Sequence, residues 1–326
     1  MEKEFGLDLK DRKILHELDK NSRISLAKLS RKVRLSKEVV FHRMNNLLKK
    51  GYILRFQTVI SSYRLGYQSY KLYLKLQNTD SEIQERLNSF LLKHKKVYWV
   101  GNCQGRWDLI IAVWIKNNRE FAEFEDEMLN KFSKYIQEKQ VSISRKSVQF
   151  NRRWFYSDNE VIETNFGEDL EEIKLDEIDM KILEYLAENS RIKMIDLADK
   201  IKTSLMVIRY RIKQLQDRKI IVGYKCSLNP KLLNYETCKS LIYLKDITEE
   251  KKNKIIEYCK SFKNVINIVL TIGSWDMEIE MEVKNFEEYY QIMKKIQDNF
   301  KEVIKNYESV LFSSEPKQVF IPKKRT

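Results

Sequence analysis

Apolar residues three and four positions apart predict three short helices within residues 11–50. Each helix has one apolar face, made by Ile14, Leu15 and Leu18, by Leu26, Leu29 and Val33, and by Val40, Met44, Leu47 and Leu48. Ser25 and Ser36 stand directly before the second and third helices, where a serine caps free backbone amides, and Gly51 ends the third. This arrangement predicts a helix-turn-helix, and the β-rich run 53–60 predicts the strand of a wing.

The opposite face of the third helix carries side chains that suit DNA. Lys37, His42 and Asn45, with Phe41 beside them, lie away from the apolar face; asparagine can pair with adenine and lysine with guanine. Arg43 lies on the flank, where it either contacts a phosphate or forms an ion pair with the first helix. The candidate DNA-contacting residues of this unit are Ser36, Lys37, Phe41, His42, Arg43, Asn45, Lys49, Lys50 and Arg55. The alternative is an ordinary amphipathic surface helix.

The pattern changes after Tyr67. Residues 70–76 alternate between apolar and polar, as in a half-buried strand. The elements that follow are a helix at 81–92, strands at 97–103 and 109–115, a helix at 119–132 and a strand at 141–150. The order βαββαβ predicts a ferredoxin-like domain.

The chain then repeats itself. DRKILHELDKNSRI begins at Asp11 and DMKILEYLAENSRI at Asp179, an offset of 168 residues, and the same offset aligns GRWD at Gly105 with GSWD at Gly273. A unit this long is a duplicated set of domains rather than a solenoid repeat. We therefore expect an α+β chain with two copies of a winged helix-turn-helix followed by a βαββαβ domain.

The second copy differs from the first on its outward face. Leu205 and Met206 replace Lys37 and Glu38, and residues 1–60 carry a balance of +8 against +4 for residues 173–230. The candidate DNA-contacting residues here are Ser204, Arg209, Tyr210, Arg211 and Lys213. This copy either reads a different half-site through thymine methyl groups or binds DNA poorly.

The two G-x-x-D turns are candidate small-molecule sites. They contain Gly105, Trp107 and Asp108 in the first copy and Gly273, Trp275 and Asp276 in the second. A glycine and an aspartate also suit a plain strand-to-strand turn, and the tryptophans either line a pocket or pack the sheet. The sequence shows no matched charged pair for an amino acid, so the absence of an effector is the alternative.

In this combination and order, the motifs resemble the Lrp/AsnC (feast/famine) family of transcription regulators. The resemblance covers nearly the whole chain, twice, and implies RAM-type βαββαβ domains that pair into dimers and often bind an amino acid at that interface, near the G-x-x-D turn. We expect winged helix-turn-helix domains at 1–60 and 173–230, effector and dimerisation domains at 61–152 and 231–326, and an acidic linker at 153–172. The pairing is expected within the chain or between two chains, with higher oligomers possible.

Charge and composition narrow the setting. The net charge of +14 indicates an anionic partner. The 4 cysteines form no zinc-ligand spacing, so we expect no metal and no cofactor. No apolar run approaches the length of a membrane span, and the N-terminus does not resemble a signal peptide, which predicts a cytoplasmic or nucleoid-associated protein. The linker holds one basic and seven acidic residues and is expected to be a solvated tether.

These features favour a sequence-specific regulator of transcription that binds double-stranded DNA and is not an enzyme. One alternative is an architectural DNA-binding protein with little base readout. A less favoured alternative is a siroheme-decarboxylase-like enzyme on the same scaffold. Such an enzyme needs acid–base groups, and the chain has only three histidines, His16, His42 and His94.

Overall fold

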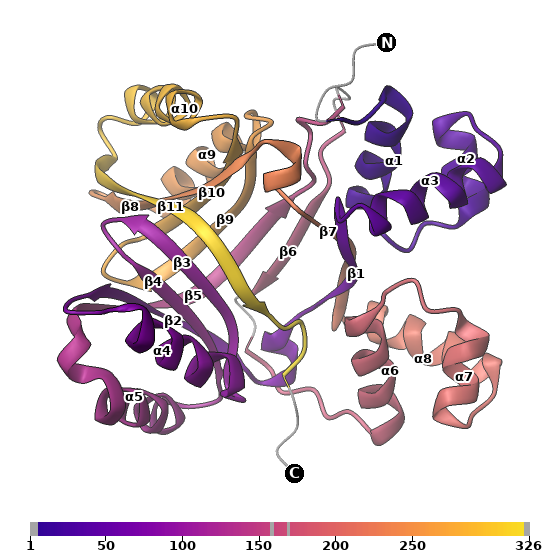
Figure 1. The fold of residues 1–326 in the computed structure, drawn as a ribbon, viewed down its shortest axis with the longest axis horizontal. Helices are drawn as coiled ribbons and strands as arrows, with labels where there is room; N and C mark the ends of the chain where they lie inside the picture. The colour runs from indigo at the N-terminus through magenta and orange to yellow at the C-terminus, as the bar shows by residue number, and fades with distance from the viewer. Residues whose placement is uncertain (1–5, 157–159, 168–169, 323–326) are drawn as a thin grey trace.

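The structure is a computed structural model that describes residues 6–156, 160–167 and 170–322. Two groups of three helices, called here the first head (residues 9–49) and the second head (residues 177–217), lie side by side at one end of the molecule (Figure 1). A β-barrel covered by four helices forms the other end. The helices are α1 (Leu9–Lys20), α2 (Leu26–Val33), α3 (Lys37–Lys49), α4 (Ser81–Lys93), α5 (Asn118–Phe132), α6 (Glu177–Glu188), α7 (Met194–Ile201), α8 (Leu205–Asp217), α9 (Glu249–Lys260) and α10 (Phe286–Asn299).

Eleven strands are present in the described residues. They are β1 (Ile53–Ile60), β2 (Gln68–Leu76), β3 (Val97–Gly105), β4 (Leu109–Ile115), β5 (Ile136–Phe150), β6 (Glu163–Gly167), β7 (Ile221–Leu228), β8 (Glu236–Leu244), β9 (Val265–Gly273), β10 (Met277–Val283) and β11 (Ile304–Gln318). The elements predicted for the first unit are thus present in the predicted order, while its final strand, β5, is longer than the predicted range 141–150.

Eight of these strands close into a barrel. The first unit contributes the order β5-β2-β4-β3 and the second the order β11-β8-β10-β9, each with ferredoxin-like connections. The two sheets join at β3–β11, where Cys103 faces Phe312, and at β5–β9, where Val148 faces Ile268. The two βαββαβ domains therefore pair within the chain, and no edge of either sheet is left open at these joints.

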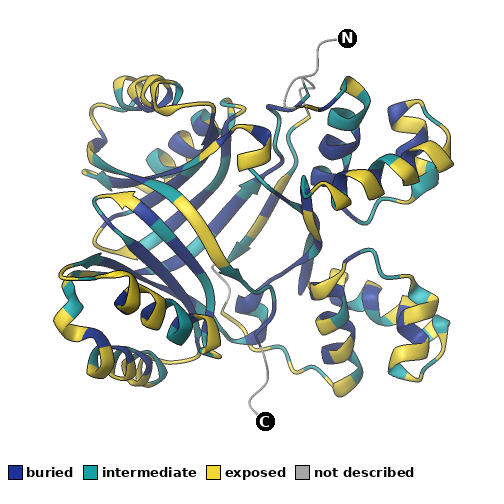
Figure 2. Cartoon of the chain, viewed as in Figure 1, coloured by how far each residue is buried: buried dark blue, intermediate teal, exposed yellow. Residues whose placement is uncertain are grey.

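Helices cover the outside of the barrel. α4 and α5 pack on the first sheet around Leu72, Ile111 and Phe124, and α9 and α10 pack on the second around Ile279 and Met293. Figure 2 shows the inner faces of these helices buried and their outer faces exposed. The helical periodicity of the sequence thus corresponds to one buried face per helix.

The strand predicted as a wing has a different role. β1 pairs antiparallel with β7 of the second unit, with Phe56 opposite Cys226, and the two form a ribbon between the heads. Each head also completes its core with residues of the other unit: Cys226 and Leu228 enter the core of the first head, and Ile60 and Leu65 enter that of the second. The strand predicted at 53–60 is therefore present, but its partner is the corresponding strand of the other unit, because an edge strand pairs with whatever edge is within reach.

The linker is also more ordered than expected. Its residues 163–167 form β6, which pairs with β5 from Lys146 to Phe150, and Trp154 and Phe155 are buried in the core of the first head. The prediction of a solvated tether was therefore wrong for these parts. Asp158, Glu168 and Asp169 lie outside the described residues.

Candidate nucleic-acid interface

Local chemistry fixes the third helix of each head in the same way. The Ser36 hydroxyl accepts a hydrogen bond from the Val39 amide at 3.3 Å, and the Ser204 hydroxyl accepts one from Val207 at 3.2 Å. Each cap satisfies a backbone donor at the helix start and defines where α3 and α8 begin. Ser25 caps α2, but Lys193 occupies the same place before α7 and makes no side-chain cap.

The apolar face of α3 is buried as the sequence predicted. Val40, Met44 and Leu47 lie in the core of the first head, and Gly51 takes a positive φ of 78° just after the helix. The outward side chains are exposed; they are Lys37, Phe41, His42, Asn45, Lys49 and Lys50. His42 also lies 3.3 Å from the Asn46 amide. This face is therefore available to a groove.

Arg43 and Arg211 make ion pairs to the first helix of their own head. Arg43 contacts Asp8 at 2.7 Å and Asp11 at 2.8 Å, and these hydrogen bonds, Asp11 first, raise the pKa of Arg43. Arg211 contacts Asp176 at 2.7 Å. Of the two alternatives for these arginines, the geometry supports the structural one.

A reciprocal contact locks the heads together. The Ser22 and Ser190 hydroxyls share a hydrogen bond of 2.7 Å. The Arg23 guanidinium donates to the carbonyls of Ser190 and Ile192, and the Arg191 guanidinium donates to those of Ser22 and Ile24. Burial lowers the pKa of both arginines. The repeated NSRI segment was the sequence signal for this contact, although its role could not be deduced from the sequence.

The second head presents a different outward face. Arg209, Tyr210 and Lys213 are exposed, as the sequence indicated, and Leu205 is half-buried. Arg55, on the ribbon, donates to the Gln318 carbonyl at 3.3 Å and lies over the Phe320 ring, so this candidate phosphate contact is already held by the C-terminal segment.

The G-x-x-D turns are occupied by structural contacts. Asp108 accepts from the Leu76 amide at 2.8 Å and from Lys75 at 2.9 Å, and Asp276 accepts from the Leu244 amide at 2.8 Å. Gly105 and Gly273 have φ of 111° and 142°, which favour glycine. Trp107 and Trp275 are buried and pack the barrel. The plain-turn alternative therefore describes both segments.

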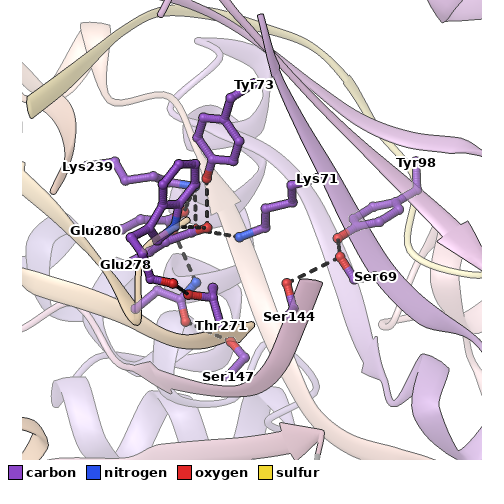
Figure 3. Close-up of polar contacts among 12 residues, drawn as sticks. Ser69, Lys71, Tyr73, Tyr98, Ser144, Ser147, Lys239, Thr271, Glu278 and Glu280 are labelled. Atoms are coloured by element: carbon purple, nitrogen blue, oxygen red, sulfur yellow. Dashed lines mark hydrogen bonds and ion pairs between the residues drawn. The ribbon is translucent and has the colours of Figure 1, made fainter. Parts of the chain in front are cut away.

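Sequence reasoning missed a buried ionic cluster inside the barrel (Figure 3). Glu278 accepts from Lys71 at 2.5 Å, from Tyr73 at 2.7 Å and from Lys239 at 3.0 Å. Lys239 also pairs with Glu280 at 3.0 Å. Burial raises the pKa of Glu278, but the charges of Lys239 and Lys71 outweigh it and hold that pKa well below its ordinary value.

A cavity of about 320 Å³ lies between this cluster and the ribbon. Its polar lining includes Ser69, Lys71, Arg152, Lys239 and Glu280. Within the described ranges, no group of three or more His, Cys, Asp or Glu side chains is placed to hold a metal ion. In the same residues, no helix combines the length and apolarity needed to cross a membrane.

The fold and the outward faces define a winged-helix protein with two paired βαββαβ domains. A winged helix-turn-helix DNA-binding family model matches residues 7–53 and 175–222, once in each head. The regulator LrpA of Pyrococcus horikoshii is 35% identical over 101 residues, which are 30% of this chain and 69% of that protein. The proline dehydrogenase transcriptional activator of Rhodobacter capsulatus is 32% identical over 130 residues, 39% of this chain and 81% of the relative.

The chain belongs to the Lrp/AsnC family of transcription regulators. Both alignments are shorter than the 168-residue offset, so neither relative matches the whole duplicated chain. The whole tandem arrangement resembles the crystal structure of the siroheme decarboxylase NirDL, with a TM-score of 0.65 at 15% identity, covering 96% of this chain and 94% of that one. This likeness concerns the fold alone.

Proposed function

We propose that the chain is a sequence-specific, DNA-binding transcription regulator whose two heads act as one unit. The observation that supports this most is the exposed outward face of α3, with Lys37, His42 and Asn45, on a head locked to its copy. A dimer of helix-turn-helix heads reads two half-sites about one helical turn apart. Here one chain supplies both heads, and the reciprocal bonds of Arg23 and Arg191 fix one head against the other.

The proposed partner is double-stranded DNA. The proposed site for a small-molecule effector is the 320 Å³ cavity rather than the G-x-x-D turns, because Asp108 and Asp276 already accept hydrogen bonds from backbone amides there. The cavity lies against the ribbon that joins the heads, so a ligand there would contact both parts of the molecule.

In vitro selection of duplexes with the whole chain tests the proposal. We expect Lys37→Ala combined with Asn45→Ala to lower affinity for the selected duplex about tenfold or more and to relax the consensus at one half-site. Binding to random duplex should fall much less, because most of its affinity comes from phosphate contacts. Fluorescence anisotropy at fixed salt measures both affinities.

Lys131→Ala is the matched control, since it removes an exposed lysine from α5, on the barrel side away from the heads. An unchanged consensus in the double variant would contradict the assignment of α3 as the reading helix. A ratio of selected to random affinity near one for the unaltered chain would instead favour the architectural alternative.

The proposal does not include decarboxylase activity. None of the three histidines lines the cavity: His16 lies against the Arg152 carbonyl, His42 is on the outward face of α3, and His94 pairs with Glu127. We expect no shift in the absorbance of an added tetrapyrrole, measured by titration with the whole chain. A saturable shift would support the enzymatic alternative.

A further inference from the structure

The two heads differ in charge on the helix that touches the DNA backbone in a helix-turn-helix. The helix before the recognition helix crosses the phosphates, and α2 carries Lys28, Arg31 and Lys32 there. The same positions in α7 are Asp196, Asp199 and Lys200. The net charge of these three side chains is +3 in α2 and −1 in α7. The second head therefore neutralises fewer phosphates than the first.

The recognition helix of the second head exposes its apolar side chains at other positions than the recognition helix of the first. On α8, Met206 is 80% exposed and Tyr210 60% exposed, whereas on α3 the exposed apolar side chains are Val39 at 41% and Phe41 at 51%. Leu205 and Met206 stand at the first two positions of α8, where α3 has Lys37 and Glu38. The N-terminal residues of a recognition helix are the ones that meet base edges.

The second head nevertheless keeps the frame of a DNA reader. Ser204 still caps α8, and Arg209 and Lys213 remain exposed on its outward face. The reciprocal bonds of Arg23 and Arg191 hold it against the first head in a fixed arrangement. When the first head is bound, the second is therefore held close to the same duplex at high effective concentration.

We propose that the second head reads an unlike half-site through apolar contacts of Leu205 and Met206 with thymine methyl groups, while the first head supplies most of the phosphate binding. The inference rests on the proposed function and specifies its second half-site. The thymine methyl is the apolar group that the major groove offers, and apolar side chains read it. The operator is therefore asymmetric, although the protein scaffold is nearly two-fold symmetric.

Thymine-to-deoxyuracil substitution tests this directly, because it removes only the methyl group. Selection is first repeated with the Lys37→Ala and Asn45→Ala variant. The half-site whose consensus this variant relaxes is the half-site of the first head. Deoxyuracil in the other half-site is expected to raise Kd about fourfold for each contacted methyl group. The same substitution in the first half-site is expected to change Kd less than twofold.

Leu205→Lys combined with Met206→Glu copies the first head and is the matched variant. It should bind thymine and deoxyuracil duplexes equally, while circular dichroism shows the fold retained. Deoxyuracil without effect on the unaltered chain, or a selected duplex with one half-site only, would overturn the inference and leave the DNA-binding function standing. In that case the apolar face of α8 would serve another partner, such as a protein. Failure to bind any duplex at low salt would overturn both.

Discussion

Glu278→Gln is expected to lower the free energy of unfolding by about 3–5 kcal/mol at pH 7, because it leaves two buried lysines facing a neutral amide. Lys239 is fully enclosed and Lys71 nearly so, and Glu278 is the carboxylate that contacts both. Tyr73 loses a charged acceptor in the same substitution. Chemical denaturation followed by tryptophan fluorescence measures the change.

The pH dependence of this deficit follows from the direction of the pKa shift. The pKa of Glu278 is lowered in the folded protein, so its stabilising contribution is present above the ordinary value near 4.5 and is lost as the pH falls through the folded pKa. The difference between the parent chain and Glu278→Gln is therefore expected to narrow below about pH 4.5. It should be constant between pH 6 and 8.

Glu287→Gln is the control, because Glu287 is an exposed residue of α10 and its change should stay within about 0.5 kcal/mol. Adding Lys239→Met to Glu278→Gln should recover part of the loss, since one unpaired charge is then removed. A deficit below 1 kcal/mol for Glu278→Gln would mean that water, rather than Glu278, solvates the two lysines.

Local pattern predicted much of this fold. The serine caps, the apolar spacing of α1–α3 and the offset of 168 residues led to the two heads and two βαββαβ domains, since these features depend on neighbours in the chain. The outward face of α3 was also predictable, because burying Val40 and Met44 leaves Lys37 and Asn45 on the other side.

What could not be predicted depends on distant partners. β10 reads MEIEMEV, an alternation typical of a strand with its carboxylates in water, but closure of the barrel buries Glu278 and Glu282. The equivalent strand β4 has Ile110 and Trp114 at these two places. The sequences of β4 and β10 do not indicate that Glu278 of the second unit neutralises Lys71 of the first. The pairing of β1 with β7 was hidden for the same reason.

Arg152→Met is expected to lower the free energy of unfolding by about 3–5 kcal/mol, since it removes the cation between two buried carboxylates. Arg152 contacts Asp19 of α1 at 2.9 Å and Glu282 of β10 at 2.8 Å, so it joins the first head to the second βαββαβ domain. Burial lowers the pKa of Arg152, but Glu282 and Asp19 outweigh it and raise that pKa. Thermal and chemical unfolding measure the loss, and amide exchange in α1 should rise with it.

The other half of the molecule supplies the comparison for this prediction. At the 168-residue offset, the positions of Asp19, Arg152 and Glu282 are taken by Ala187, Phe320 and Trp114. The second head is therefore held without these charges. Asp19→Asn and Glu282→Gln added to Arg152→Met should therefore restore most of the stability, because the repelling carboxylates are gone. The stability of Arg152→Lys should lie between that of the parent chain and that of Arg152→Met, because lysine keeps the charge but not the forked contact. If the triple variant is no more stable than Arg152→Met, packing of the arginine stem rather than its charge holds the first head in place.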